Sequence, residues 1–261
     1  MRAPDDPDGP ATHVIVFATL GAAERRRLAA RRRPREVAAA PPPTPVATGR
    51  ATVIDVGAPL TGEAAERWLS AAGENELAAG LAVLNRALHA FRLVSADPHV
   101  HPVGRDQPIA VRVGFGAGEE VADGLWTRAR DIPPAGRARR RRARVLAPQA
   151  RLAAVLGARQ ATLAGEELTL RARLDLDAGR PREAALQLLV ALDATLAELG
   201  RDAHATELAP RLQELRDRRE AVADAAQAAL AGPLDDDRVA VVAEAVARVE
   251  VALRARAAAA G

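Results

Sequence analysis

Several side chains that carry out chemistry in enzymes are missing from this sequence. It contains no cysteine, no lysine and no tyrosine, and it has only two serines and two asparagines. The lack of cysteine excludes a thiol nucleophile, a disulfide and a thiolate metal site, and the lack of lysine excludes a Schiff base and a Walker-type phosphate loop. A catalyst would have to work with carboxylates, five histidines, threonine and arginine. We therefore favour a non-catalytic protein and expect no catalytic residues, no metal and no cofactor.

Long hydrophobic runs are also scarce. The longest strongly apolar stretch covers residues 13–23, which is shorter than the roughly 20 residues of a membrane-spanning helix. The first ten residues combine aspartates with prolines, whereas a secretory signal begins with basic residues ahead of its apolar run. The absence of cysteine fits a reducing compartment. These features predict a cytoplasmic protein with no membrane partner.

Alanine and arginine dominate what is present. Alanine occupies 64 of the 261 positions, and all 37 basic residues are arginine. Hydrophobic residues make up 49% of the chain, which excludes wholesale disorder, and alanine has the highest intrinsic helix propensity. We predict a mostly helical fold: a small α/β (α+β) N-terminal part followed by an antiparallel helical bundle.

The first half of the sequence mixes strand and helix patterns. Residues 1–49 predict a disordered, proline-rich region that holds one strand, over residues 12–17, and a short helix over residues 24–35. A small α/β domain is predicted over residues 50–130, with strands at 51–56 and 109–115 and helices at 61–72 and 74–95. In the longer helix, apolar residues recur every three or four positions, at Leu77, Leu81, Leu84, Leu88 and Phe91. We expect this apolar seam to pack on the sheet.

The second half predicts only helices, and residues 148–261 are expected to form the bundle. Helical patterns cover residues 163–178, 181–199 and 206–230, and a last helix begins near three consecutive aspartates, Asp235 to Asp237. Its apolar positions are Val239, Val242, Val246, Val249 and Leu253, again three or four residues apart. The last two helices are expected either to pack as an antiparallel hairpin or to mediate a dimer.

One stretch of this half resembles a known repeat family. Small and packing residues between Leu168 and Leu199 have the spacing of a single tetratricopeptide repeat, at Ala172, Gly179, Ala184, Leu188 and Ala191. The resemblance covers about 32 residues, lacks the usual aromatic residues and closing proline, and has no second copy. It implies a protein-interaction surface; an ordinary helical hairpin with an alanine-rich crossing explains the same residues.

An arginine-rich segment separates the two halves and is predicted to be a linker over residues 131–147. The net charge is +7 for residues 131–160 and −5 for residues 161–261. Such a segment can neutralise phosphates of nucleic acid or another polyanion, but it can equally be a solvated linker or lie against the acidic helices. Six arginines within eight residues form the candidate site: Arg137, Arg139, Arg140, Arg141, Arg142 and Arg144.

Two loops offer an alternative site in the region 97–118. His99 and His101, with Asp97 or Asp106 as a third ligand, have residue types that bind zinc or iron. Glycines at 114, 116 and 118 can approach a phosphate, although Glu119 and Glu120 follow them; a glycine turn opening a short helix that Gly124 closes is the simpler interpretation. The two loops flank one predicted strand and would lie about 20 Å apart, which argues against a joint site.

Together these patterns favour a non-catalytic interaction or scaffold protein. Its expected partners are another protein, or a second copy bound through helices, and nucleic acid or another polyanion at the arginine-rich linker. The alternative is a ligand-binding or metal-dependent enzyme domain with its site in the region 97–118. Measuring polyanion binding at two salt concentrations, and the metal content of the purified protein, separates the two hypotheses.

Overall fold

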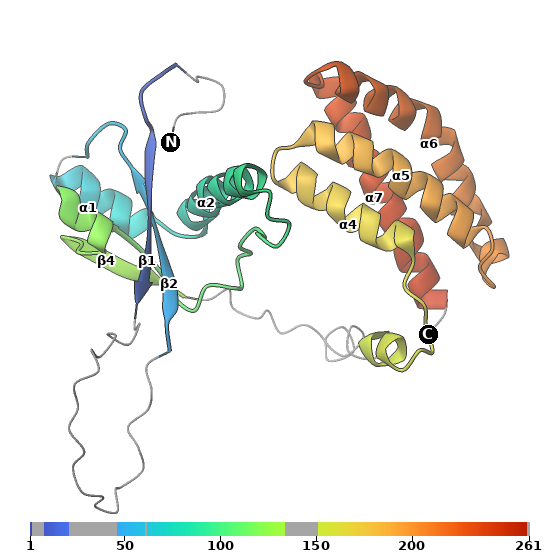
Figure 1. The fold of residues 1–261 in the computed structure, drawn as a ribbon, viewed down its shortest axis with the longest axis horizontal. Coiled ribbons are helices and arrows are strands. Elements are labelled where there is room, and N and C mark those ends of the chain that lie inside the picture. The colour runs from blue at the N-terminus through green and yellow to red at the C-terminus, as the bar shows by residue number, and fades with distance from the viewer. Residues whose placement is uncertain (2–7, 21–45, 61, 134–150, 260–261) are drawn as a thin grey trace, which may run out of the picture. The chain divides into compact units, whose positions relative to one another are not determined.

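The computed structural model describes residues 1, 8–20, 46–60, 62–133 and 151–259. The chain divides into two compact units, Met1–Gly136 and Arg137–Gly261, which are shown in Figure 1 and are described separately below. The predicted fold class is confirmed, because helices dominate the second unit and two small antiparallel sheets lie in the first. The helix predicted over residues 24–35 lies outside the described residues.

The described part of the second unit contains four long helices whose bounds lie within two residues of those predicted. They are α4 (Ala164–Asp177), α5 (Pro181–Leu199), α6 (Ala205–Ala231) and α7 (Asp236–Ala259). Short turns join them, so helices that are neighbours in sequence pack against each other in antiparallel pairs. Helix α7 also packs on α4 and α5 and thereby closes the bundle.

The bundle encloses a single aliphatic core. Its largest fully buried hydrophobic side chains come from α5, α6 and α7. They include Leu192, Leu208 and Leu215, together with the predicted apolar positions Val242, Val246 and Val249. Arg219, which interrupts the predicted apolar pattern of α6, points to α5 and forms an ion pair with Asp193 at 2.6 Å. The periodic aliphatic residues therefore form the core, as the sequence predicts.

Side chains from neighbouring helices complete the ends of several helices in this unit. Glu198 of α5 accepts hydrogen bonds from the first amides of α4, those of Ala164 and Gly165, both at 2.9 Å. Arg182, at the start of α5, donates to the carbonyl of Ala229 in the last turn of α6 at 2.9 Å. Groups that a lone helix would leave to water are thus satisfied between helices.

The described residues of the first unit form two separate two-stranded antiparallel sheets, two α-helices and one short 3₁₀ helix. In chain order its elements are β1 (His13–Leu20), β2 (Thr48–Asp55), α1 (Gly62–Ala71), α2 (Glu74–Ser95), β3 (Val111–Phe115), the 3₁₀ helix η1 (Glu119–Asp123) and β4 (Arg128–Ile132). Strand β1 pairs with β2 in a register that sets Phe17 opposite Ala51, and β3 pairs with β4 so that Gly114 lies opposite Ala129.

The strands of this unit differ from the sequence-based prediction in their bounds and in their number. Strand β1 covers residues 13–20 rather than 12–17, and β2 covers residues 48–55 rather than 51–56. Strand β3 begins at Val111 rather than at residue 109, and Ile109 is almost fully exposed. Strand β4, which supplies the partner of β3, was not predicted, because its sequence RARDI contains a single large aliphatic residue, Ile132. Because charged residues occupy three of its five positions, the strand lacks the alternation of apolar and polar residues by which strands are predicted.

The apolar seam of α2 is only partly covered, which corrects the expectation that the whole seam packs on the sheet. Leu77 and Leu84 are buried, whereas Phe91 near the end of the helix is exposed. Leu93 and Val94 follow it and are also exposed, Val94 at 89%. The last turns of α2 therefore present an apolar surface, which we call the α2 apolar end and define as Phe91, Leu93 and Val94.

Among the described helices, α2 alone is long and apolar enough to cross a membrane by length and composition. The sequence-based search for continuous apolar runs did not single it out, because charged residues such as Arg86 and Arg92 interrupt it. A single helix of this kind is weak evidence for a membrane span, since helices of water-soluble proteins pass the same test.

Candidate functional site

The predicted arginine cluster, Arg137, Arg139, Arg140, Arg141, Arg142 and Arg144, lies outside the described residues. The chain becomes described again at residue 151, where one turn of helix covers residues 151–156. Arg151 forms an ion pair at 2.5 Å with Glu166 in the first turn of α4. This ion pair attaches the helical turn at residues 151–156 to the first turn of α4.

An ion-pair network at the same end of the bundle centres on Arg256 of α7. Its side chain is 10% exposed and donates from Nε to Asp202, 13% exposed, at 3.0 Å. Its Nη1 donates to the carbonyl of Ala161 at 3.4 Å and lies 4.0 Å from Glu166. The backbone amide of His204, followed by Arg256, lowers the pKa of Asp202 below its ordinary value. The network joins α7 to the turn before α6 and to the segment that leads into α4.

Sequence reasoning missed this network, although the sequence contains a signal for it. Leu253 lies four residues after Val249, and Arg256 lies three residues after Leu253. Arg256 therefore continues the apolar seam of α7. A charged residue on an apolar seam is rarely buried without a partner. The position of Arg256 on this seam therefore predicts a carboxylate partner from another part of the bundle, and this partner is Asp202.

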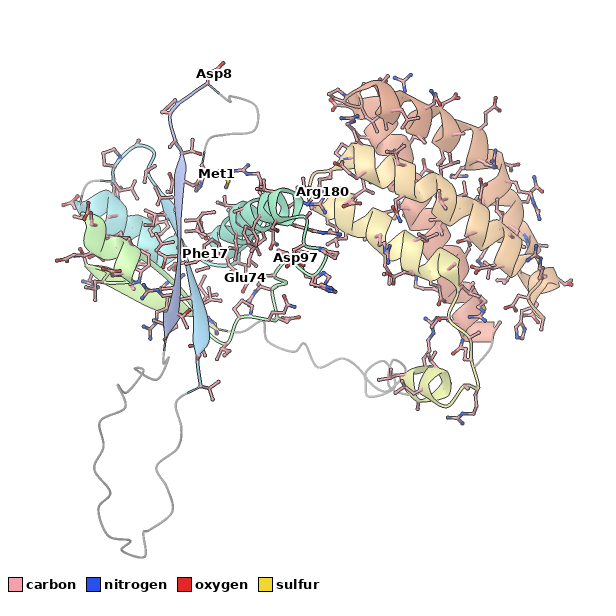
Figure 2. All side chains as sticks on the ribbon, viewed as in Figure 1. Met1, Asp8, Phe17, Glu74, Asp97 and Arg180 are labelled. Atoms are coloured by element: carbon pink, nitrogen blue, oxygen red, sulfur yellow. The ribbon has the colours of Figure 1, made fainter. Side chains whose placement is uncertain are left out.

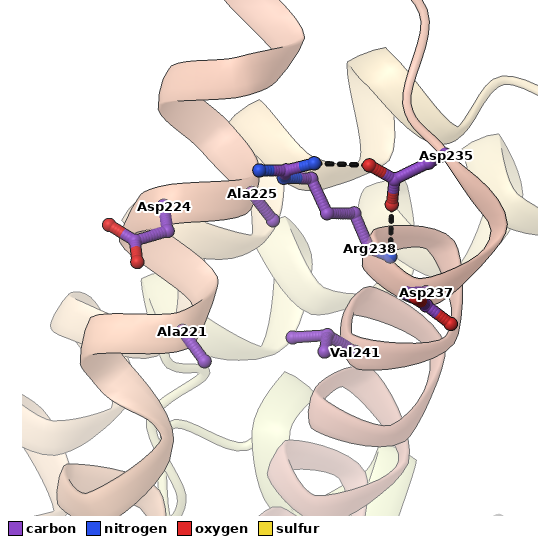
Figure 3. A pocket seen from close by; sticks show the side chains of 7 residues that line it. All are labelled: Ala221, Asp224, Ala225, Asp235, Asp237, Arg238 and Val241. Carbon is purple, nitrogen blue, oxygen red and sulfur yellow. Dashed lines mark hydrogen bonds and ion pairs between the residues drawn. The ribbon is translucent and has the colours of Figure 1, made fainter.

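A shallow groove of about 350 Å³ lies between α6 and α7 (Figure 3). Alanines of α6 and Val241 form its floor, and carboxylates stand at its rim. Asp235 accepts a hydrogen bond from the backbone amide of Arg238 at 2.8 Å and pairs with the guanidinium of the same residue, and these contacts lower the pKa of Asp235. The aspartates stabilise the N-terminus of α7, which confirms their predicted role at a helix end.

The glycines at 114–118 are explained by backbone packing. A Cβ on Gly114 would lie 2.6 Å from the carbonyl oxygen of Arg128 in β4, and one on Gly116 would lie 2.7 Å from a methyl of Val121 in η1. Gly118 and Gly124 have positive φ angles of 68° and 76° on either side of η1. The interpretation as a glycine turn that opens a short helix closed by Gly124 is confirmed.

The histidine loop is held by turn contacts. Asp97, labelled in Figure 2, accepts a hydrogen bond from the backbone amide of His99 at 2.9 Å, and the side chain of Asn85 bonds both backbone groups of Val103. His99 and His101 are exposed. Within the part of the chain that the structure describes, no group of three or more histidine, aspartate or glutamate side chains could hold a metal ion. Among the described residues, neither Asp97 nor Asp106 forms a three-ligand group with His99 and His101.

The residues of the repeat-like stretch lie in the α4–α5 hairpin. Ala172, Ala184, Leu188 and Ala191 are fully buried, and Gly179 has a φ of 70° in the turn between the helices. These positions allow the two helices to cross closely, as in an ordinary alanine-rich hairpin. No family model matches this chain, and no curated protein and no solved structure matches it.

Proposed function

We propose that this chain is a non-catalytic interaction protein of the cytoplasm, and that the arginine-rich segment contacts nucleic acid. In this proposal the helical bundle is a rigid body, and Arg137, Arg139, Arg140, Arg141, Arg142 and Arg144 form the contact that binds phosphates. Guanidinium groups at this density can form bidentate phosphate contacts and release several counterions.

The observation that carries this proposal is the pairing of charges within the bundle. Ten of the 18 carboxylates in residues 161–259 lie within 4.0 Å of an arginine that the structure describes in the second unit. Ion pairs also join different helices, as Arg173 with Glu250, Arg218 with Glu244, and Arg219 with Asp193 do. The acidic helices thus already have partners for most of their charge, which supports an external polyanion for the six arginines.

The kind of nucleic acid follows from the scarcity of aromatic residues. Proteins that grip single strands stack bases on aromatic side chains, and the chain has only two tryptophans and three phenylalanines. Duplex DNA or RNA, bound through its phosphates, fits this composition better. We therefore expect duplex to bind more tightly than a single strand of the same length.

A protein partner is the second part of the proposal, and the α2 apolar end supports it. Phe91 and Val94 lie three residues apart and therefore share a face of α2, and exposed apolar side chains on one face commonly mark a contact with another protein. Phe91 offers an aromatic anchor of the kind that dominates interface energetics. This surface fits an apolar partner helix or groove.

The test of the nucleic-acid contact uses fluorescence anisotropy with a labelled duplex of mixed sequence. The variant R139Q/R140Q/R141Q removes three positive charges, and its control R31Q/R32Q/R33Q removes the same number from another arginine run. We expect the slope of log K against log salt to fall by about 3 in the first variant and by much less in the control. No binding at low salt, or equal losses in the two variants, would contradict the proposal.

A further inference from the structure

Among the described residues, β1 pairs with a strand on one side only, and its other edge is apolar. The strand HVIVFATL contains no charged residue and no proline, which are the usual means of protecting an exposed sheet edge. Three of its large apolar side chains, Val14, Phe17 and Leu20, are exposed. A two-stranded sheet with such an edge is a template for a further strand.

The hydrogen bonds of Met1 show which backbone groups face this edge. The amide of His13 donates to the carbonyl of Met1 at 3.2 Å, and the amino group of Met1 donates to the carbonyl of His13. Because backbone groups alternate along a strand, the amides and carbonyls of Ile15, Phe17 and Thr19 face the same side. The described part of the chain supplies no backbone partner for them beyond Met1, which Figure 2 labels near the start of β1.

We propose that a second copy of this chain pairs with β1 in antiparallel orientation, with a two-fold axis at Phe17. In this register Phe17 lies opposite its own copy, Ile15 lies opposite Thr19, and Val14 lies opposite Leu20. The outward amides and carbonyls of Ile15, Phe17 and Thr19 then form hydrogen-bonded pairs with the partner strand. The β1–β2 sheets of the two copies then form one four-stranded sheet across the dimer.

The spacing of the exposed residues is what favours a second copy over another peptide. Val14 and Leu20 are each three residues from Phe17, so rotation about Phe17 places exposed side chains against exposed side chains. Facing aromatic and aliphatic pairs stabilise neighbouring strands, and an uncharged strand meets its own copy without like charges opposite each other. Met1 beside His13 limits the pairing to residues 14–20, the segment that is symmetric about Phe17.

The first test measures the mass of the full chain by light scattering and sedimentation over a concentration series. Phe17→Glu places two carboxylates opposite each other at the axis, and we expect it to raise the dimer dissociation constant at least about tenfold. Leu125→Glu is the matched control, since Leu125 is 62% exposed and Phe17 is 60% exposed in the same unit. We expect the control to remain dimeric and both variants to keep the circular dichroism spectrum of the parent.

A monomeric mass of the unmodified chain over the whole series would overturn the inference. So would a dimer that survives Phe17→Glu, and loss of the dimer in Phe91→Glu alone would assign self-association to the α2 apolar end instead. Phe17→Thr, which retains a residue that favours strands, covers the case in which the glutamate variant does not fold. With this variant we expect a weakened dimer, and unchanged dimerisation counts against the proposed register.

The second test uses the absence of cysteine in the natural sequence. Phe17→Cys places a thiol next to its own copy, with Cα atoms about 5.5 Å apart, whereas Thr19→Cys lies opposite Ile15 and roughly 14 Å from its copy. A short bismaleimide should therefore couple the first variant into covalent dimers much faster than the second. Equal coupling of the two variants, or no coupling of the first, excludes an axis at Phe17.

Discussion

The two units of this chain bury apolar side chains to different depths. In the helical unit, large side chains such as Leu192 and Val246 are completely inaccessible to solvent. In the N-terminal unit, the large residues of the core keep some exposure, and Leu84 retains 8%. The α2 apolar end and the outer edge of β1 both lie in this less fully buried N-terminal unit.

This difference indicates where each unit obtains its stability. Four antiparallel helices of 14 to 27 residues enclose a core that needs no further element. Two-stranded sheets are marginal by themselves, and those of the N-terminal unit depend on α1, α2 and side-chain contacts such as that of Arg50 with the carbonyl of Asp123 at 2.6 Å. A unit of this kind gains most from a bound partner.

The largest expected effect on stability comes from truncating one large core side chain in each unit. Leu192→Ala should destabilise the helical unit by about 3–5 kcal/mol, and Leu84→Ala should destabilise the N-terminal unit by about 2–3 kcal/mol. Both tryptophans, Trp68 and Trp126, lie in the N-terminal unit, so their fluorescence follows that unit, while far-ultraviolet circular dichroism is dominated by the bundle. In urea titrations each variant should shift its own probe. Equal shifts of both probes in both variants would show that the units unfold together.

A smaller effect is expected from the Arg256 network. Asp202→Asn leaves Arg256 without its nearest carboxylate and should cost about 2 kcal/mol at neutral pH. The folded state lowers the pKa of Asp202, so its contribution is complete above the unfolded-state pKa of about 4 and is lost as the pH falls below it. The stability difference between parent and variant should therefore shrink in acid.

The control for this prediction is an exposed ion pair of the same unit. Arg219 and Asp193 are 50% and 43% exposed, and Asp193→Asn should cost less than about 1 kcal/mol. Chemical denaturation of both variants at neutral and acid pH provides the comparison. A loss in Asp193→Asn as large as that in Asp202→Asn would show that burial does not distinguish the two pairs.

The smallest predicted effect is a gain of stability in the N-terminal unit. Gly80 lies inside α2, and a Cβ there would meet no atom within 4 Å. Gly80→Ala should raise the stability of this unit by about 0.5–1 kcal/mol, because alanine loses less backbone entropy in a helix. Thermal unfolding followed by tryptophan fluorescence measures the change.

The opposite sign is expected at a glycine of the helical unit. A Cβ on Gly165 would lie 2.4 Å from Oγ1 of the buried Thr195, so Gly165→Ala should destabilise the crossing of α4 and α5. This loss of stability should appear in the unfolding transition of the bundle followed by circular dichroism. If Gly80→Ala also destabilises its unit, then α2 packs more tightly than the structure indicates.

The helices could be predicted from the sequence because their packing follows a local rule. Aliphatic residues at spacings of three and four fix a helix face without any knowledge of its partner, and Val242, Val246 and Val249 are buried accordingly. The same rule overestimates burial in α2, where Phe91 obeys the spacing but has no partner element over it. Periodicity predicts which residues share a face, but coverage depends on the tertiary fold.

Strand pairing and ion pairs could not be predicted, because they join distant segments. Strand β1 pairs with β2 across the 27 residues that separate Leu20 from Thr48. Strand β4 exists because Gly114 lets its backbone approach β3, and Arg128 reaches Glu66 at 3.3 Å. Arg256 and Asp202 are 54 residues apart in the sequence. The arginine-rich segment remains a prediction.

The way in which helix ends are completed between neighbours has a consequence for how the protein is made. The first amides of α4 donate hydrogen bonds to Glu198, which is synthesised after them. The carbonyl of Ala161 accepts a hydrogen bond from Arg256, which lies 95 residues later in the chain. On the ribosome, the early helices therefore emerge with unsatisfied termini and an uncovered aliphatic face. We therefore expect the nascent bundle to expose aliphatic surface to chaperones and proteases until α7 has been synthesised.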